Sequence, residues 1–379
     1  MNSTGESRAA MESPKYRVIF ETLHQEILAR RYKSGGRLPS EAELVRRFGA
    51  SRMTVLKAIK ELQALGLVSR RVGSGTYVAD QSETGSHVFG LLIPSLGQTE
   101  IFEPICQGMM LSPKAKQHSL LWGHSVSNDS RGEEVAEKLC QQYIAQRVSG
   151  VFFAPIEYSA CRHETNRKIA AALDRAKIPI VLLDRCLAPY PKRSKYDLVG
   201  IDNHRAGYLA AEHLIHSGAK RICFFGRPNS APTVDARISG FRQALASSGE
   251  PPCAEGWVRS GEPDDAALIG SILKTDRPDA FLCANDDTAG HLMHTLMVLE
   301  KRIPEDIRIV GIDDMKYARL LPVPLTTIHQ PCQNLGKMAI SMMLDRIANP
   351  DLPTRDLLLS CELVVRRSCG SAPPRTSSG

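Results

Sequence analysis

The chain has 379 residues, a formal net charge of +7, 42% hydrophobic residues and 23% charged residues, which is ordinary for a globular protein of two or three folded units. No apolar run approaches the roughly 18 residues that a membrane-spanning helix needs. Residues 1–13 are polar and lack the apolar core of a signal peptide, so we expect a cytoplasmic protein that begins with a disordered tail at residues 1–13.

The N-terminal region differs from the rest of the chain in charge and in cysteine content. Residues 1–80 hold fourteen Lys and Arg against eight Asp and Glu, which gives +6 of the total net charge of +7. Such an excess indicates either a polyanionic partner or a well-solvated basic surface. All ten cysteines lie at or after Cys106 and none forms a Cys-x-x-Cys pair, so we expect free thiols rather than disulfides.

Two helices are predicted at the start of this region. Residues 14–29 carry apolar side chains three or four positions apart, which places them on one face of a helix. Ser40 with Glu43 three residues later is a capping box, in which each residue's side chain bonds the other's backbone amide. This pair starts a second helix, which ends at Gly49.

A third helix and a hairpin follow directly. Ser51 caps the third helix and Gly66 ends it, so the second and third helices form a helix-turn-helix, the unit with which many proteins read DNA. Residues 67–72 and 76–78 are strand-like and flank a glycine turn at residues 73–75. A basic hairpin in this place is a wing.

Four motifs of this region, in the same order, resemble the DNA-binding domain of the GntR family of regulators. They are Leu38–Glu41, Phe48–Val55, Leu65–Val68 and Gly73–Thr76. The resemblance covers residues 14–79 and implies a winged helix-turn-helix that binds a palindromic operator as a homodimer. The family usually has an arginine directly after Val55, where this chain has Leu56, so the operator is expected to differ from that of typical relatives.

The resemblance and the position of each side chain give a set of expected DNA contacts. The third helix should place its first residues in the major groove, where Arg52 can donate two hydrogen bonds to a guanine edge and Thr54 can reach phosphate. Basic residues outside it suit phosphate contacts, which set affinity rather than sequence choice. The full set is Lys15, Arg37, Ser51, Arg52, Met53, Thr54, Lys57, Arg70, Arg71 and Gly75.

After a polar linker the pattern changes to apolar strands that alternate with amphipathic helices. This alternation predicts an α/β fold with parallel sheets covered by helices on both faces, and its length suits two lobes. The expected strands are 88–93, near 120, 151–154, 180–183, 198–201, 222–225, 280–283 and 309–312. The expected helices are near 102–116, then 133–146, 205–217, 235–247 and 286–299.

Eight segments of this large region resemble the effector-binding domain of the LacI family, which is similar to periplasmic sugar-binding proteins. They are Ala145–Val151, Val181–Asp184, Val199–Asn203, Ala210–Leu214, Asp235–Phe241, Cys283–Asp286, Ile309–Asp314 and Pro324–Gln330. The combination with a GntR-type head resembles the arabinose-responsive repressors. We expect a DNA-binding domain at 14–79, a linker at 80–87, an effector domain at 88–368 and a disordered tail at 369–379. Within the effector domain, lobe 1 is expected at 88–198 plus 331–357, and lobe 2 at 199–330 plus 358–368.

In this family the ligand lies between the lobes, at the carboxyl ends of the strands. Asp184, Asn285 and Asp313 each follow an expected strand, and Arg237 lies near the start of a helix. Such polar groups suit the hydroxyls of a sugar, which also needs an apolar surface to stack on. The expected effector residues are Ser95, Phe102, Asp184, Arg237, Asn285, Asp313 and Gln330.

Other chemistry has weaker support in the sequence. His213/His216 and His291/His294 have the spacing of helical metal ligands but lack further ligands, and adjacent aspartates such as Asp313 and Asp314 point apart on most backbones. No catalytic or nucleotide-binding motif occurs, so we expect no enzyme, no metal and no cofactor.

These observations predict a repressor of carbohydrate-utilisation genes that a small sugar releases from DNA. Three alternatives also fit the residues. The ligand could promote DNA binding instead of releasing the protein from DNA, the effector could be a nucleobase or another metabolite, or the protein could bind DNA without responding to any ligand.

Overall fold

The computed structural model describes residues 15–29, 31–33, 35–64, 67–71, 75–78, 86–93, 101–123, 132–248 and 257–371. The chain divides into two units, residues 1–88 with 117–119, and the remainder. Among the described residues, no helix is long and apolar enough to cross a membrane. The nine cysteines described there are free thiols, as expected.

The N-terminal unit contains the three expected helices and the wing strands. Its elements are α1 (Lys15–Leu28), α2 (Glu41–Phe48), α3 (Arg52–Ala64), β1 (Val68–Arg71) and β2 (Gly75–Val78). The apolar positions at helical spacing in α1 face inward, and Ile19 and Leu23 are buried against Leu44, Val55 and Leu62. This small core fixes the angle between the helices.

Caps define the turn between α2 and α3. The Ser40 amide donates to the Glu43 carboxylate at 2.6 Å and the Glu43 amide donates to Ser40 Oγ at 3.3 Å, so the predicted capping box is confirmed. Gly49 ends α2 with φ 54°, a left-handed conformation that glycine adopts without strain. Ser51 Oγ then accepts from the Thr54 amide at 3.2 Å and caps α3.

The wing is an antiparallel pair in which Val68 lies opposite Val78 and Arg71 opposite Gly75. Arg37 forms an isolated bridge to Tyr77, so the segment before α2 extends the wing by one residue. The predicted turn residues Gly73 and Ser74 lie outside the described residues, as do Gly66 and the linker residues 80–85.

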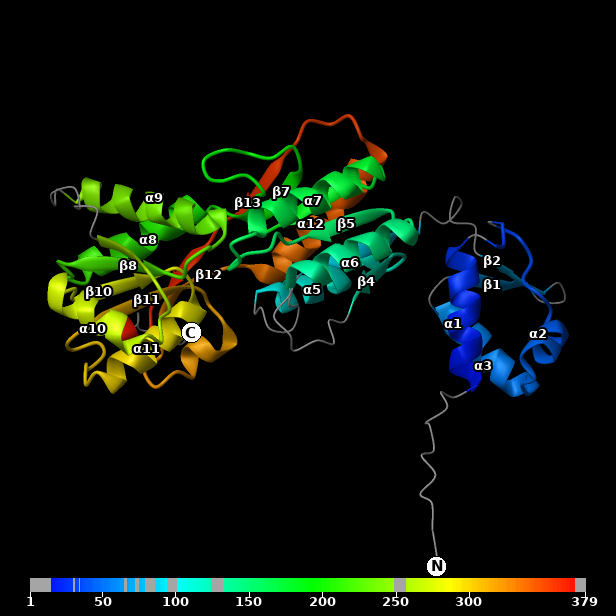
Figure 1. Cartoon of the computed structure of the whole chain (residues 1–379), viewed down its shortest axis with the longest axis horizontal. Helices are drawn as coiled ribbons and strands as arrows, with labels where there is room; N and C mark the ends of the chain where they lie inside the picture. Colours follow the sequence, from blue (N-terminus) through cyan, green and yellow to red (C-terminus); the bar gives the residue numbers. More distant parts are fainter. Residues whose placement is uncertain are drawn as a thin grey trace, which may run out of the picture. The chain divides into compact units, whose positions relative to one another are not determined.

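The larger unit has two six-stranded sheets, as predicted from the alternating pattern (Figure 1). The first, in spatial order, is β4 (Ser119–Trp122), β3 (Val88–Leu92), β5 (Gly150–Phe153), β6 (Ile180–Leu183), β7 (Asp197–Ile201) and β13 (Asp356–Leu359). The second is β9 (Val258–Ser260), β8 (Ile222–Gly226), β10 (Ala280–Cys283), β11 (Arg308–Asp313), β12 (Thr326–His329) and β14 (Glu362–Val364). Neighbouring strands pair in parallel from β3 to β13 and from β9 to β12, while β14 runs antiparallel to β12.

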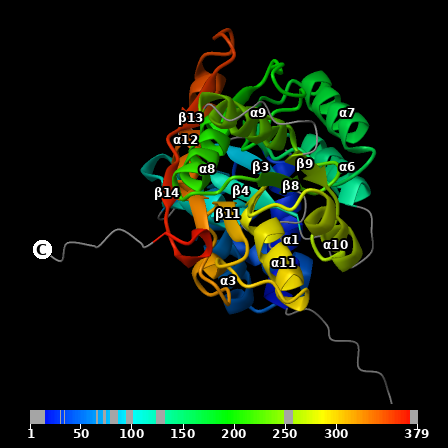
Figure 2. The ribbon, with the colours of Figure 1, turned by 90° about the vertical axis from the view of Figure 1, so that its left-hand side faces the viewer.

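Helices cover both sheets. Those associated with the first are α5 (Phe102–Leu111), α6 (Gly132–Ala145), α7 (Arg162–Arg175) and α12 (Cys332–Ala348), with α5 against α12 and α6 against α7. Those associated with the second are α8 (Asn203–His216), α9 (Pro232–Ser247), α10 (Ala266–Thr275) and α11 (Asp286–Val298). Figure 2 shows the second sheet between α8 with α9 and α10 with α11. Short 3-10 turns are η1 (Pro113–Ala115), η3 (Lys316–Arg319) and η4 (Arg367–Cys369).

The chain crosses between the lobes three times: after β7, between β12 and α12, and after β13. The lobe limits expected at residues 198 and 357 fall inside β7 and β13, so the strands place the crossings a few residues later. The helix expected near 102–116 stops at Leu111, because Pro113 follows it. The C-terminal tail was expected from residue 369, but Cys369 is buried within the second lobe.

Candidate DNA interface and effector site

The first turn of α3 presents exposed side chains to solvent. The Arg52 side chain is 75% exposed and Met53 is 75% exposed, so both are free to meet a partner. Ser51 Oγ and Thr54 Oγ1 lie 2.8 Å apart and the Ser51 oxygen is already used in the helix cap. Leu56, where the GntR pattern has arginine, is half-buried.

Glu41 links the two arginines that were assigned to DNA from different elements. Its carboxylate accepts from Arg52 Nε at 3.0 Å and from Arg70 Nη2 at 2.7 Å. The carboxylate is only 20% exposed, so it holds both guanidinium groups at one side of α3 and the wing. The sequence interpretation missed this role of Glu41 and used the residue only as part of a motif.

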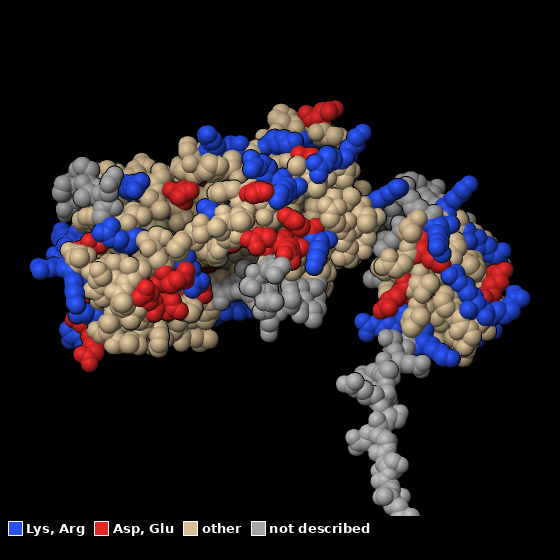
Figure 3. Space-filling model, in the orientation of Figure 1, with Lys and Arg blue, Asp and Glu red and all other residues tan. Residues whose placement is uncertain are grey.

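The remaining expected DNA residues take several positions. Arg37 lies against the wing, because a Cβ on Gly75 would be 2.8 Å from Arg37 Nε. Lys57 Nζ lies over the Tyr16 ring, 3.9 Å from its centroid, so it is held toward α1. Lys15 is exposed at the first residue of α1, and Arg71 lies in β1. Figure 3 shows Lys and Arg groups on the visible face of this unit, with smaller acidic groups among them.

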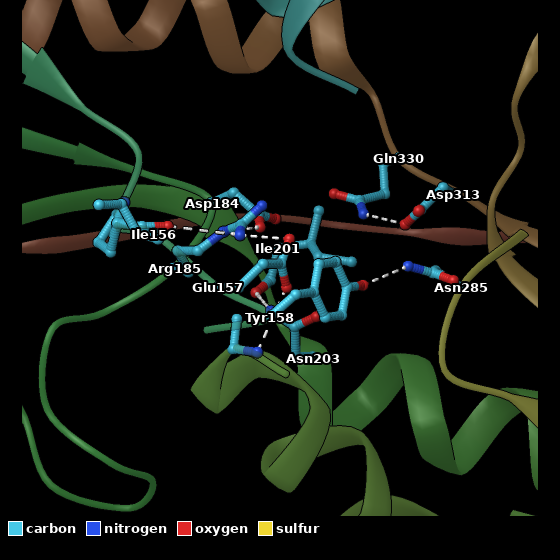
Figure 4. Close-up of polar contacts among 12 residues, drawn as sticks. Ile156, Glu157, Tyr158, Asp184, Arg185, Ile201, Asn203, Asn285, Asp313 and Gln330 are labelled. Carbon is cyan, nitrogen blue, oxygen red and sulfur yellow. Dashed lines mark hydrogen bonds and ion pairs between the residues drawn. The ribbon is translucent and has the colours of Figure 1, made fainter. Parts of the chain in front are cut away.

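The expected effector residues come from both lobes and from a crossing segment (Figure 4). Asp184 follows β6 in the first lobe, Arg237 and Asp313 belong to the second, and Gln330 lies between β12 and α12. Asp184, Arg237 and Gln330 are buried, with Asp184 4% exposed. Ser95 lies outside the described residues.

Asp184 holds a strained backbone position at the end of β6, with φ 66°. Its Oδ2 is 3.3 Å from Arg185 Nε. Its Oδ1 is buried and has no hydrogen-bond partner within the part of the chain that the structure describes. A buried carboxylate oxygen without a partner is costly, so it favours a donor from a bound molecule.

Arg237, Asp313 and Gln330 form a connected group in the second half of the cleft. Arg237 donates to Asn203 Oδ1 at 2.8 Å and to the Ala284 carbonyl at 2.5 Å, and its Nη2 is 3.6 Å from Asp313 Oδ1. Gln330 Nε2 donates to the same Asp313 oxygen at 2.6 Å. Burial raises the pKa of Asp313 well above its usual range, against the lowering effect of Arg237.

Gln330 offers a second free acceptor. Its Oε1 is buried and unpartnered among the residues described. A cavity of about 510 Å³ opens beside Gln330 and Asp313, between the start of α5 and η3. Asp184, Arg237 and Phe102 do not line that cavity, whereas Asp313 and Gln330 do.

Asn285 and Phe102 are already engaged in this structure. Asn285 Oδ1 accepts from the Thr288 amide at 2.9 Å and caps α11, while its Nδ2 donates to Tyr158 Oη at 3.1 Å. Phe102 is buried and its ring lies under the Arg185 guanidinium, 5.1 Å from the centroid. A ligand would have to displace Tyr158 to reach the Asn285 amide.

Glu157, Tyr158 and Arg185 are cleft residues that the sequence interpretation missed. Glu157 forms an ion pair with Arg185, and its other oxygen accepts from the Ala231 amide of the second lobe at 3.3 Å. A partial signal was available, because Arg185 follows β6 closely, whereas Glu157 is separated from β5 by the apolar residues 154–156. Their pairing depends on loop conformation, such as φ 59° at Tyr158, which the sequence does not reveal.

The adjacent aspartates turn apart, as expected. Asp313 meets Gln330, whereas Asp314 pairs with His329 at 3.0 Å and with Arg366 at 2.5 Å. Asp286 is fully buried against Thr327, and its pKa is raised to about 6 by burial. No group of three or more potential metal ligands occurs among the described residues.

Two family models match the chain. Residues 15–78 match the bacterial regulatory proteins of the gntR family, and residues 211–369 match a periplasmic binding protein-like domain.

Similar proteins extend over most of the chain. An arabinose metabolism transcriptional repressor of Geobacillus stearothermophilus is 29% identical over 94% of this chain and 97% of its own length. The HTH-type transcriptional repressor PurR of Photorhabdus laumondii is 32% identical over 75% of this chain and 80% of its own length. A solved LacI family regulator from Enterococcus faecium with bound ribose is 25% identical, with a TM-score of 0.59 over 76% of this chain and all of the other.

Proposed function

The chain belongs to the LacI-like family of transcriptional regulators and carries a GntR-type DNA-binding domain, and from that premise we propose that it represses carbohydrate-utilisation genes until a small sugar releases it from DNA. Its relatives are transcription repressors, so it is a DNA-binding regulator rather than an enzyme. The operator, the effector and the cytoplasmic location belong to the proposal.

The proposal assigns sequence reading to the start of α3. Arg52 is exposed there and oriented by Glu41, so its guanidinium can meet a guanine edge in the major groove. Arg70, held by the same carboxylate, suits a phosphate contact beside it. Both arginines must leave Glu41 or share it with DNA on binding.

A homodimer on a palindromic operator is the second part of the proposal. Large apolar side chains stand exposed at the end of α5, at the end of α11 and after η3: Leu111 is 63% exposed, Val298 62% and Leu320 78%. Apolar side chains that solvent does not favour suit burial between two copies. Two heads then meet two half-sites of DNA.

The observation that carries the sugar assignment is the pair of buried, unpartnered acceptors Asp184 Oδ1, after β6, and Gln330 Oε1, between β12 and α12; Figure 4 draws both residues. A sugar presents several hydroxyl donors on one small frame, which suits two such acceptors. The opening of about 510 Å³ is within the range of small-molecule sites. The related regulator with bound ribose supports the same assignment.

The proposed mechanism is a shift between lobe arrangements. Tyr158 donates its amide to the Asn229 carbonyl at 2.8 Å, and Arg162 Nη1 donates to Asn229 Oδ1 at 2.8 Å, so these contacts join the lobes. A sugar that binds the joined arrangement more tightly increases its population in proportion to that difference in affinity. The altered dimer then places its two heads at a spacing that no longer fits the operator.

A thermal-shift screen of the full chain with pentoses, hexoses and purines tests the effector class. We expect at least one sugar to raise the midpoint of unfolding, because a ligand that binds the folded state stabilises it. Stabilisation by a purine alone contradicts the sugar assignment.

A nucleobase is the second candidate, and one observation favours it. Phe102 and Tyr158 bring two aromatic rings to the same cleft, and flat rings suit a planar base. The same screen decides between the two classes. If no ligand changes the affinity of the chain for DNA, the regulator responds to neither.

A further inference from the structure

The effector cleft contains five ionisable side chains close to one another. Glu157, Asp184 and Asp313 are acidic, while Arg185 and Arg237 are basic. All five are at least four-fifths buried, so water screens their charges weakly. The five groups together carry no positive excess, whether Asp313 is ionised or protonated. The cavity beside Gln330 adds two carboxylates, Glu103 and Asp314, against Lys316 and His329.

Arg237 is committed to the protein. Its Nε donates to Asn203, its Nη1 to the Ala284 carbonyl, and its Nη2 faces Asp313 at 3.6 Å. Each nitrogen of the guanidinium therefore has an acceptor or a carboxylate beside it. An anionic ligand would have to compete with Asp313 for this cation.

Arg185 is balanced in the same way by two carboxylates. Its Nη1 pairs with Glu157, its Nε lies 3.3 Å from Asp184, and its flat face covers Phe102. Glu157 is itself fixed, since its second oxygen accepts from the Ala231 amide at 3.3 Å. A buried guanidinium that lost Glu157 would need another anion to replace it.

We propose that Glu157 is the residue that excludes anionic ligands from the effector site, so that the site accepts uncharged, hydroxyl-bearing molecules and rejects sugar acids and sugar phosphates. This inference rests on the proposed effector function and narrows its ligand class. Glu157 occupies the position on Arg185 that a carboxylate or phosphate group of a ligand would take. Asp184 adds a second carboxylate beside Arg185.

The test compares matched neutral and anionic probes on the full chain. Galactose with galacturonate, glucose with glucuronate, ribose with ribose 5-phosphate, and inorganic sulfate are titrated calorimetrically into wild type, Glu157→Gln and Glu164→Gln. Glu164→Gln is the matched control, because it removes one carboxylate from an exposed ion pair with Lys168 in the same lobe. A thermal unfolding scan of each variant shows whether it is folded.

We expect wild type and Glu164→Gln to bind the neutral member of a pair at least about tenfold more tightly than the anionic member. The Glu157→Gln protein should show a preference for the neutral member that is about tenfold smaller. Sulfate should raise the midpoint of thermal unfolding of Glu157→Gln, but not that of wild type or Glu164→Gln. If Glu157→Gln does not unfold cooperatively, Glu157→Ala, which also removes the carboxylate, serves in its place with the same expected direction.

Two results would overturn the inference. One is a wild type that prefers the anionic member of any pair. The other is a folded Glu157→Gln or Glu157→Ala protein with unchanged preference and no response to sulfate. If wild type binds no neutral sugar but the Glu157→Gln variant gains binding of sulfate or a uronate, the sugar assignment fails and the role of Glu157 stands.

Discussion

In the proposed DNA interface, the Glu41 carboxylate orients Arg52, because it accepts from Arg52 Nε at 3.0 Å. The Arg52 side chain is 75% exposed, so its ion pair with Glu41 adds little to stability. Its effect is positional, because it restricts a long side chain that is otherwise mobile at the start of α3. Arg70 shares the same carboxylate, so the helix and the wing present their cations together.

Replacing Arg52 with alanine should relax sequence preference at one base pair of each half-site. The expected loss is about 1–3 kcal/mol of discrimination at that position, since a bidentate contact to guanine is removed. Fluorescence anisotropy on the operator and on its single-base variants measures it. Arg17→Ala, which removes an exposed arginine of α1 outside the predicted DNA set, is the control. Unchanged discrimination by Arg52→Ala would remove this residue from the base-reading positions.

Glu26 makes the N-terminal unit sensitive to acid. It is buried and accepts from Arg47 at 2.5 Å, from Arg31 at 2.9 Å and from Tyr32 at 3.0 Å. The hydrogen bond from Arg47 is the largest cause that lowers the pKa of Glu26, from 4.5 to about 2. A carboxyl whose pKa is lower when folded stabilises the fold above its unfolded pKa and loses that effect as the pH falls.

We therefore expect the N-terminal unit to lose stability between pH 4.5 and about pH 2. Glu26→Gln should lower stability at pH 6 by about 2 kcal/mol and flatten the dependence on pH over that interval. Calorimetric unfolding of the full chain at several pH values measures both effects. An equal slope for wild type and Glu26→Gln would show that another group causes the acid sensitivity.

At the residue scale, the sequence was enough to place some of the expected site residues in the fold but not others, for a physical reason. Residues that directly follow a strand, such as Asp184 and Asp313, could be placed at one edge of a sheet from the pattern alone. Glu157 and Arg185 could not be paired, since their contact depends on how two loops bend. In the structure, the Asn285 side chain caps α11, and the sequence alone does not distinguish a capping residue from a ligand-binding residue at the end of a strand.

Paired helices position the effector residues. The pair α8 and α9 packs closely through Gly207 and Gly240, where a Cβ would collide with the backbone oxygens of Arg237 and His204. Arg237 therefore reaches the cleft because α9 lies directly on α8. The pair α5 and α12 uses Gly108 and Gly336 in the same way.

Gly207→Ala should push α9 away from α8 and displace Arg237. We expect a loss of about 2 kcal/mol in unfolding free energy from overpacking, together with weaker sugar binding. Gly270→Ala in α10 is the matched control, because a Cβ there meets nothing within 4 Å, and it should be neutral or slightly stabilising. Urea unfolding and calorimetric titration measure the two quantities. Normal sugar affinity in a destabilised Gly207→Ala protein would contradict the claim that the packing of α9 on α8 positions Arg237 for sugar binding.

Five helices of the larger unit, α5, α6, α8, α9 and α11, were predicted, whereas α7, α10 and α12 were not. The bounds expected for α8 differ from the observed ones by one or two residues, and those expected for α11 differ by one residue at its C-terminal end. The helix α7 was missed, because it opens with a polar run, Arg162–Lys168, and its apolar residues follow only later. The short edge strand β9 has only three residues, too few for a periodic pattern to show.

For the whole molecule, the core of the DNA-binding unit is separate from the cores of the larger unit. In the proposed mechanism, a signal from the cleft therefore acts through the arrangement of the proposed dimer. The contacts of Tyr158 and Arg162 with Asn229 give the joined lobes a defined state that a ligand can stabilise. The division into two sheets was predictable from the order of strands and helices. The residues at which the chain crosses between the lobes were harder to predict, because β7 and β13 continue for a few residues beyond the expected lobe limits before the chain leaves the first sheet.

The most direct test is the affinity of the full chain for its operator, selected from a random DNA pool, with and without the sugar that stabilises it. We expect the sugar to weaken operator binding by about tenfold or more, within the usual range of coupling between two sites. An Asp184→Ala protein, which lacks the proposed acceptor, should bind the operator normally and fail to respond. An operator affinity that no stabilising ligand changes would contradict the claim that the cleft controls DNA binding.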